Sequence, residues 1–332
     1  MGGKFAENFL TAIQENRDFI PIHIESLRLD SITGFDLYLQ ASPDEPVVLY
    51  ANHRVAFTEE SRQRLSQNQV EYLLISSEQQ EQYRTYLESN LSAVLSDPTI
   101  GLDLKTEILY TSAHGLMREL FERPHMKGGM LRSREIVRNT VDFIHSNRLA
   151  LRHLVETAAT DYQMYTHSVN GCVLGIALAR RVGLRDPAHL NEFGVGALLR
   201  DIGMTRIDVA IREKPEKLTV CEYETLKEHP KFSEEMVRGL GETSGIALDV
   251  ARHHHEKMDG MGYPDRLAGD EIAPLSRVMT IADVFDALTT SRPYQSSLGS
   301  FDALQLMQTR MEGELDADYL RAFIEMMGNP TR

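Results

Sequence analysis

The sequence lacks any apolar run long enough to cross a bilayer, since its longest such stretches are only a few residues. Residues 1–6 lack the pattern of a secretory signal peptide. They also lack the Ser or Thr at position 6 that myristoylation prefers. We therefore expect no membrane insertion and a cytoplasmic location.

Cysteine is scarce. The two cysteines, Cys172 and Cys221, fall in predicted helices and do not form a pair with metal-ligand spacing. This usage predicts free, buried thiols in a reducing compartment. It also excludes a fold stabilised by several disulfides.

Basic residues are outnumbered: 35 Lys and Arg stand against 49 Asp and Glu, giving a formal net charge of −14. This balance argues against a surface for polymeric nucleic acid, which needs a clustered basic face. It leaves room for a small anionic ligand held by a few local cations or a metal. The hydrophobic fraction of 42% is that of an ordinary globular protein, and 332 residues suggest two domains.

Strand-like runs occur only near the N-terminus. Four runs have β-branched and aromatic character: Phe19–Ile24, Phe35–Gln40, Val47–Tyr50 and Val70–Ile75. They predict a small α+β domain over 1–80. Apolar spacing of three and four predicts a helical connector over 81–150, suited to homodimer formation, with a third helix from about Arg132 to Ala158. We expect no strand after residue 80, so the fold class is mainly α.

Helix signals continue through 151–332. Asp186-Pro187 predicts a helix start, and Thr219 to Glu222 form a capping box. The helix that begins there is expected to carry His229 and to break at Pro230. These short helices predict an all-α domain.

Three consecutive histidines, His253 to His255, are followed by Glu256 and by a turn that contains Gly260, Gly262 and Pro264. Imidazole is the commonest protein metal ligand near neutral pH. The stretch predicts a helix that ends at a metal, with the loop as the lip of a pocket. The alternative is a polar helix end, where histidines are favoured by the helix dipole.

Potential ligands recur across five predicted helices or helix ends: His167, Asp201, His229, His254, His255 and Asp283. Imidazole with carboxylate suits a divalent transition metal, with iron or manganese favoured and zinc or nickel as alternatives. A carboxylate such as Asp201 could bridge two ions, an arrangement that activates water against phosphate esters.

From about Asp161 to the C-terminus, roughly half of the chain, the sequence resembles the HD-GYP family, helical HD-superfamily phosphodiesterases that hydrolyse cyclic di-GMP. The matching motifs are Tyr165-Thr166-His167-Ser168, the segment Lys214 to Thr219, Lys227-Glu228-His229-Pro230, the block His254 to Pro264, the segment Ala282 to Leu288, and Arg292-Pro293-Tyr294. The resemblance implies an HD-type helical domain over 151–332.

The family pattern implies two metal sites. The first would use Asp201, His229, His254 and His255, all of which are present. The second would use His167, Asp201, Asp283 and a histidine that is Arg200 here. Arginine stays protonated and has no free lone pair, so it cannot coordinate. The resemblance therefore implies one or two ions per chain.

Other departures lie on the same side of the site. The expected lysine three residues after the aspartate is Met204, the lysine after Arg292 is Gln295, and the glutamate that supports a third metal in some members is Gln163. Positions 200 and 204 would lie one turn apart on one helix face. Arg200 would then occupy the space of the lost metal or bind an anionic ligand as a bidentate donor. The alternative is an arginine without a ligand role, which faces outward or pairs with Asp283.

Ligand-binding candidates are Arg200, Arg292 and Tyr263; Asp201 and Tyr263 are the catalytic candidates if the site is active. Tyr263 could contact a phosphate oxygen or only pack the loop, and Arg292 could hold a phosphate or pair with an acid. Asp286 is expected to orient a histidine ligand.

Three functions follow, in this order. The first is a degenerate HD-GYP module with weak or no hydrolysis, which acts as a receptor for cyclic di-GMP or a related dinucleotide, or as an interaction module with a signalling partner at Gly260–Pro264. The second is an active phosphodiesterase. The third is a metal-free scaffold.

Overall fold

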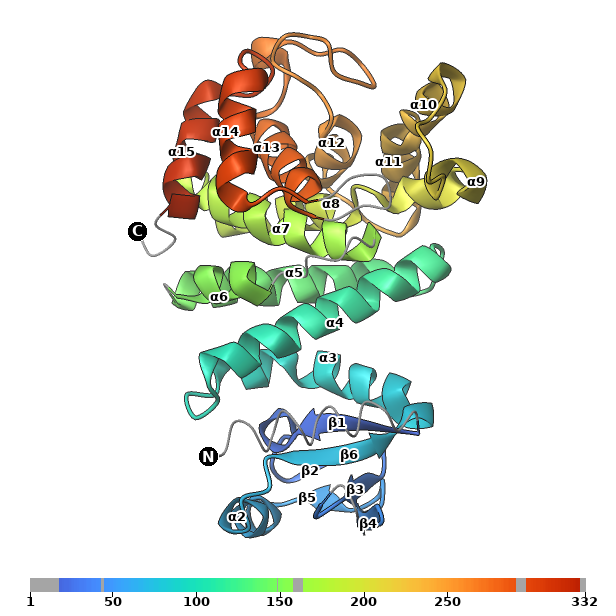
Figure 1. The fold of residues 1–332 in the computed structure, drawn as a ribbon, viewed down its shortest axis with the longest axis vertical. Helices are drawn as coiled ribbons and strands as arrows, with labels where there is room; N and C mark the ends of the chain where they lie inside the picture. Colours follow the sequence, from blue (N-terminus) through green and yellow to red (C-terminus); the bar gives the residue numbers. More distant parts are fainter. Residues whose placement is uncertain (1–17, 43–44, 148, 158–163, 291–296, 329–332) are drawn as a thin grey trace. The chain divides into compact units, whose positions relative to one another are not determined.

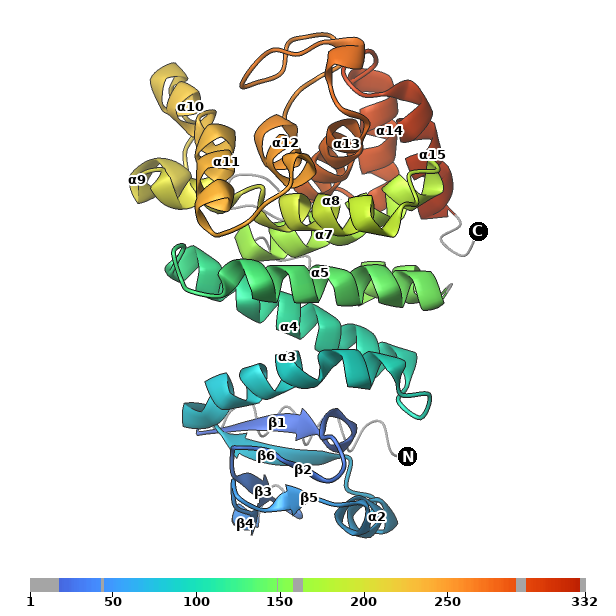
Figure 2. The same ribbon diagram turned by 180° about the vertical axis from the view of Figure 1, so that it is seen from behind.

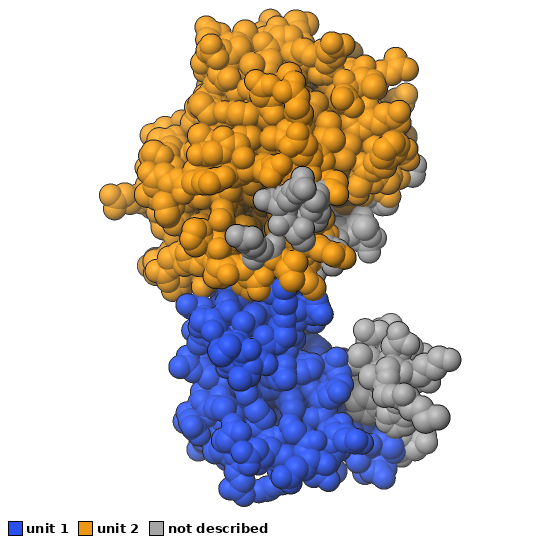
Figure 3. All heavy atoms as spheres, turned by 90° about the vertical axis from the view of Figure 1, so that its left-hand side faces the viewer, with its two compact units in different colours: residues 1–108 blue, residues 109–332 orange. Residues whose placement is uncertain are grey.

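The computed structural model describes residues 18–42, 45–147, 149–157, 164–290 and 297–328. The chain forms two compact units, Met1–Ile108 and Leu109–Arg332, which Figure 3 colours separately. The boundary falls inside helix α4, Leu102–Glu122. The division into 1–80, 81–150 and 151–332 stays a prediction.

The first unit contains an antiparallel sheet with the order β1-β6-β3-β4 (Figure 1). These strands span Phe19–His23, Tyr72–Ser76, Leu37–Leu39 and Val48–Ala51. Two further strands, β2 (Ser31–Ile32) and β5 (Ala56–Phe57), pair separately and were not predicted. Each has only two residues, too few to show the alternation that identifies a strand.

Helices α2 (Glu59–Gln67) and α3 (Gln80–Ser96) complete this unit. Thr58 caps α2, because its side chain accepts from the Ser61 amide. On α3, the rings of Tyr83 and Tyr86 each meet Phe35 edge-on at 5.5 Å between centroids. These contacts join the helix to the segment before β3.

In the described part of the second unit, helices joined by loops form the regular secondary structure. Its helices after α4 are α5 (Gly129–Ser146), α6 (Ala150–Thr157), α7 (Met164–Arg181), α8 (Pro187–Leu199), α9 (Val209–Arg212), α10 (Val220–Leu226), α11 (His229–Gly239), α12 (Gly245–His253), α13 (Pro274–Thr289), α14 (Ser300–Arg310) and α15 (Ala317–Gly328). Beyond Ser76 no strand forms among the described residues, since Asp259 and Ala268 make only an isolated bridge. The mainly α fold with a small N-terminal sheet is confirmed.

Helix α7 forms the centre of this unit, with every residue from Thr166 to Ala179 buried. Helix α7 packs against α8 and α13. Helix α8 in turn contacts α12 on one side and α5 on the other (Figure 2). None of the described helices has the length and apolar character needed to span a membrane.

Four local predictions need correction. The helix expected from Arg132 to Ala158 is two helices, because the chain leaves the helical region at Asn147, where φ is −133° and ψ is 117°. Pro230 does not break a helix but lies in the first turn of α11. Cys221 is exposed, unlike Cys172, because α10 has no buried residue.

The fourth correction concerns the end of α8. The helix ends at Leu199, and Asp201 precedes a separate 3-10 helix over Ile202–Arg206. Arg200 and Met204 therefore do not share one helix face. The change of path turns Asp201 toward α11.

Candidate metal centre

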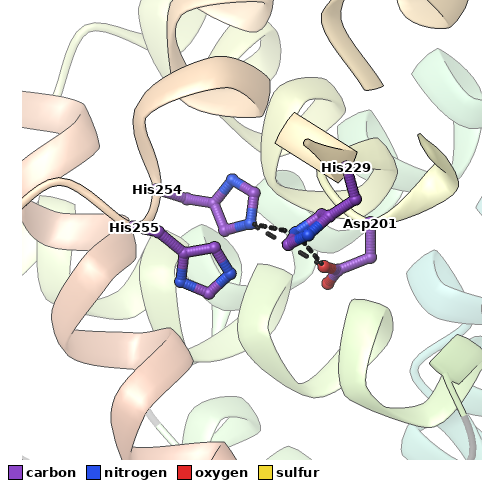
Figure 4. Close-up of side chains that lie close together, drawn as sticks. All are labelled: Asp201, His229, His254 and His255. Atoms are coloured by element: carbon purple, nitrogen blue, oxygen red, sulfur yellow. Dashed lines mark hydrogen bonds and ion pairs between the residues drawn. The ribbon is translucent and has the colours of Figure 1, made fainter. Parts of the chain in front are cut away.

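Four predicted ligands lie together in the second unit, as Figure 4 shows. Asp201 follows α8, His229 opens α11, and His254 and His255 follow the last residue of α12. One ligand atom from each lies within 4.8 Å of the others. The four groups are thus close enough to share one ion.

Gly203 allows α11 to approach this closely. A Cβ atom at that position would lie 2.2 Å from the His229 carbonyl oxygen and 2.5 Å from the Ser233 nitrogen. The Gly203 amide instead donates to Ser233 Oγ at 2.9 Å. This contact fixes the 3-10 helix after Asp201 against the start of α11.

The rings of His229 and His254 are oriented by backbone carbonyls. His229 Nδ1 donates to Leu226 O at 2.8 Å, and His254 Nδ1 donates to Ala251 O at 3.1 Å. Their Nε2 atoms then face each other at 3.3 Å. Two imidazole lone pairs at this distance repel unless a proton or a cation lies between them, so the arrangement favours a bound cation.

The carboxylate of Asp201 has an atom available for the same ion. Its Oδ1 lies 3.4 Å from His229 Nε2 and 3.7 Å from His254 Nε2. Its Oδ2 is buried and makes no hydrogen bond within the part of the chain that the structure describes. Arg200 Nε lies 3.3 Å from this oxygen and balances its charge, so Oδ1 is the atom available to the ion.

The protonation states match metal binding. Burial alone would raise the pKa of Asp201, but the opposing effects, of which the charge of Arg200 is the largest, hold this pKa well below its usual range. Burial lowers the pKa of His254, and burial together with the His254 charge lowers the pKa of His255 well below its usual range. Near neutral pH these groups are therefore an ionised carboxylate and neutral imidazoles, the forms that bind metals.

A second group, His167, Asp201 and Asp283, also has ligand atoms within 4.8 Å of one another. Arg200 lies beside it with a relative exposure of 0%. Arg200 Nε donates to Asp283 Oδ1 at 2.9 Å and lies 3.3 Å from Asp201 Oδ2. The second group therefore already contains a fixed positive charge.

The rest of the guanidinium is held by backbone carbonyls. Arg200 Nη1 donates to Ala197 O at 2.9 Å, and Nη2 donates to His167 O at 3.0 Å. Burial would raise the pKa of Asp283, but the charges of His167 and Arg200 keep it well below its usual range. Asp283 and Arg200 thus form a buried, charged pair.

His167 lies between two carboxylates. Its Nδ1 is 2.6 Å from Asp286 Oδ2, and its Nε2 is 3.0 Å from Asp283 Oδ1. Burial and the Arg200 charge lower its pKa, but Asp283 and Asp286 outweigh them and raise the pKa of His167 to about 9. Asp286 also accepts from Asn170 Nδ2 at 2.8 Å, so it orients His167 from behind.

We expect this imidazolium to make stability depend on pH in chelator-treated protein. Because the folded pKa is raised from 6.5 to about 9, its contribution is complete below about pH 6.5 and is lost as pH rises through about 9. The loss should amount to about 3 kcal/mol. Denaturant unfolding of wild type and His167→Gln between pH 6 and 10 measures it; parallel curves would contradict the expectation.

The loop Gly260–Pro264 lies against the histidines. The Tyr263 ring is 4.7 Å from the His255 ring, with an angle of 31° between them, and the Tyr263 amide donates to His255 O. Gly262 permits this approach, because a Cβ atom there would lie 2.5 Å from Glu256 Cα. Lys227 Nζ lies 5.9 Å from the Tyr263 ring centroid. Tyr263 thus flanks the candidate ligand His255, and Lys227 lies on the side of Tyr263.

Glu256 was not predicted as a functional residue, although its place between the histidines and the glycines is a signal. It is buried, with 1% exposure. Its Oε1 accepts from the amides of Asp265 and Arg266, and its Oε2 accepts from Leu267. Glu256 therefore fixes the far side of the loop. Arg292, Gln163 and Gln295 lie outside the described residues.

Comparison with known proteins agrees with this geometry. Over 179 residues the chain is 38% identical to a cyclic di-GMP phosphodiesterase of Pseudomonas aeruginosa. This alignment covers 54% of this chain and 43% of that protein. Over 156 residues it is 34% identical to 3'3'-cGAMP-specific phosphodiesterase 3 of Vibrio cholerae, covering 47% and 34% respectively. The matches thus span less than half the length of these relatives.

A solved structure shares the fold. An HDG"Y"P protein from Bdellovibrio bacteriovorus aligns with a TM-score of 0.67 and 23% identity, covering 94% of this chain and 100% of that one. Residues 148–318 match the HD domain family, which is half of the chain. The resemblance drawn from the motifs is confirmed, and the chain belongs to the HD-domain family.

Proposed function

We propose that this chain is a cyclic-dinucleotide signalling protein whose HD domain holds one divalent transition metal and hydrolyses its ligand weakly or not at all. Asp201, His229, His254 and His255 would hold the ion. The names of the relatives support cyclic di-GMP or a related cyclic dinucleotide as the ligand. The protein would then act as a receptor or interaction module.

The observation that carries this proposal is the position of Arg200. Its guanidinium lies 2.9 Å from Asp283 and 3.3 Å from Asp201, where a second ion would need the same two carboxylates. A dication at that place would meet the repulsion of a buried fixed charge, which the low interior dielectric strengthens. His167 adds a second positive charge when protonated. The carboxylates are thus neutralised without a second metal.

A bound ion would polarise a phosphate oxygen and lower the pKa of a coordinated water. The chain's own residues would place the ligand. The Tyr263 ring lies beside His255, and its hydroxyl would be a donor to an anionic phosphate. Arg292 is proposed as a further phosphate contact. A single ion cannot clamp both the attacking and the leaving oxygen, so hydrolysis would be slow.

The alternative is an active phosphodiesterase, favoured by the complete set of four ligands and by the activity that the relatives' names state. A metal-free scaffold has less support, since it would leave the Nε2 atoms of His229 and His254 facing each other at 3.3 Å with no cation between them. Homodimer formation through 81–150, the sensory role of 1–80 and a protein partner at Gly260–Pro264 stay proposals.

Metal content tests the proposal directly. Protein purified without oxygen and supplied with Fe²⁺ or Mn²⁺ should contain one ion per chain by elemental analysis. His254→Ala should weaken binding about 100-fold or more, because it removes a ligand and costs more than loss of an outer-shell partner. His189→Ala is the matched control, since His189 has 64% side-chain exposure and lies outside both ligand groups. Two ions in the wild type would contradict a one-metal centre.

Ligand binding and turnover separate the two functions. Titration calorimetry with cyclic di-GMP should show binding by the metal-loaded chain, and chromatography of the same mixture should show little product. Robust hydrolysis that His255→Ala abolishes would overturn the proposal in favour of the active phosphodiesterase. Absence of both binding and metal would favour the scaffold.

A further inference from the structure

The guanidinium of Arg200 lies against the backbone of α7 at one residue, Gly171. A Cβ atom added to Gly171 would be 2.7 Å from Arg200 Nη2 and 2.8 Å from both Cζ and Nη1. All three distances are shorter than carbon contacts in folded proteins allow. The space of one methyl group at position 171 is thus taken by the guanidinium.

The guanidinium cannot move aside without losing its partners. It is bonded to Asp283 through Nε and to the carbonyls of Ala197 and His167 through Nη1 and Nη2. It has no exposure to solvent. A side chain at position 171 would therefore have to break a buried charged pair or distort the packing of α7.

Glycine is otherwise an unfavourable choice here. Position 171 lies in the middle of α7, where glycine costs about 1 kcal/mol relative to alanine. Its backbone φ is not in the left-handed region, so conformation gives no reason for glycine. The close approach of Arg200 does give a reason for glycine at position 171.

We propose that Gly171 is a positioning residue, which makes room for the arginine that takes the place of the second metal. This inference rests on the proposed one-metal centre. Gly171 and Arg200 act as a pair: glycine matters only when arginine occupies position 200, and arginine fits only when glycine occupies position 171. Gly171 itself contacts neither metal nor nucleotide.

A double-mutant cycle tests the pair without any enzyme assay. In chelator, Gly171→Ala should shift the unfolding equilibrium of the wild type about tenfold or more toward the unfolded state, the size expected for overpacking. In an Arg200→Ala background the same change should be neutral or mildly stabilising, since alanine favours the helix. Equal effects in the two backgrounds would overturn the pairing.

Gly175→Ala is the matched control, four residues further along the same helix. A Cβ atom there would lie 2.8 Å from Phe193 Cζ, so the substitution is also crowded but does not meet Arg200. It should destabilise both backgrounds by the same factor. If it too depends on residue 200, the coupling is a general property of α7 and the proposal fails.

Metal content supplies the second readout and covers the case in which Arg200→Ala does not fold. Arg200→His loaded with Mn²⁺ should bind two ions, and Arg200→His with Gly171→Ala should bind the same two. Loss of an ion on adding Gly171→Ala would show that glycine serves the metal and not the arginine. A wild type that binds two ions would refute the one-metal function while leaving the stability cycle as a separate result.

Discussion

Replacing Arg200 with alanine is expected to lower the free energy of unfolding of metal-free protein by about 3–5 kcal/mol. The reason is that Asp283 and Asp201, both buried, would lose the charge that keeps them ionised. Four hydrogen bonds of the guanidinium would be lost as well. Thermal and denaturant unfolding followed by circular dichroism, at pH 7 with chelator, measure the loss.

Arg206→Ala is the control for this prediction. Arg206 pairs with Glu235 on the surface, where both side chains are about half exposed, at 45% and 64%. Removing an exposed pair costs about 1 kcal/mol or less. Arg200→Lys should recover only part of the lost stability, because an ammonium cannot make the fork of bonds that guanidinium makes. A loss at Arg200 no larger than at Arg206 would refute a buried structural cation.

The second large effect is expected from Arg200→His combined with Met204→Lys. This pair restores the ligand and the lysine that the family pattern implies. The metal content should rise from one ion to two, and hydrolysis of cyclic di-GMP should increase about 100-fold or more, since a second ion contributes several kcal/mol to stabilisation of the transition state. Elemental analysis and product chromatography on the same sample measure both quantities.

Asp283→Asn in this double variant provides the internal control. It removes the carboxylate of the second ligand group while leaving Asp201, His229, His254 and His255 intact. Metal content should return to one and the gained rate should disappear. An unchanged rate in Arg200→His/Met204→Lys would show that these two positions do not account for weak hydrolysis.

The sequence predicted those helix starts that a single capping side chain determines. Asp186 and Thr219 each make the cap that their side chains suggested, and α8 and α10 begin beside them. The break at Asn147 was missed because its neighbours keep a helical apolar spacing. Pro230 was misread because proline is compatible with a first turn as well as with a break.

The site divides in the same way. The motifs identified residues whose ligand atoms lie within 4.8 Å of one another in the structure, because the type of each side chain can be read from the sequence. The direction of the Arg200 side chain was not visible, since it depends on Gly171 and Asp283, distant in sequence. The three amides held by Glu256 belong to a loop path that no local pattern specifies.

That loop path has a thermodynamic consequence. The proposed ligand His255 and the loop anchor Glu256 are consecutive residues, so movement of the loop away from its three anchored amides would displace His255. If His255 holds the ion, binding at the loop and binding of the ion are linked equilibria. Whatever factor the ion applies to the affinity of a molecule at the loop, that molecule must apply to the affinity for the ion. The concentration of metal would then set the affinity of the loop for its binding partner, and that partner would set the affinity for the metal, through the peptide bond between His255 and Glu256.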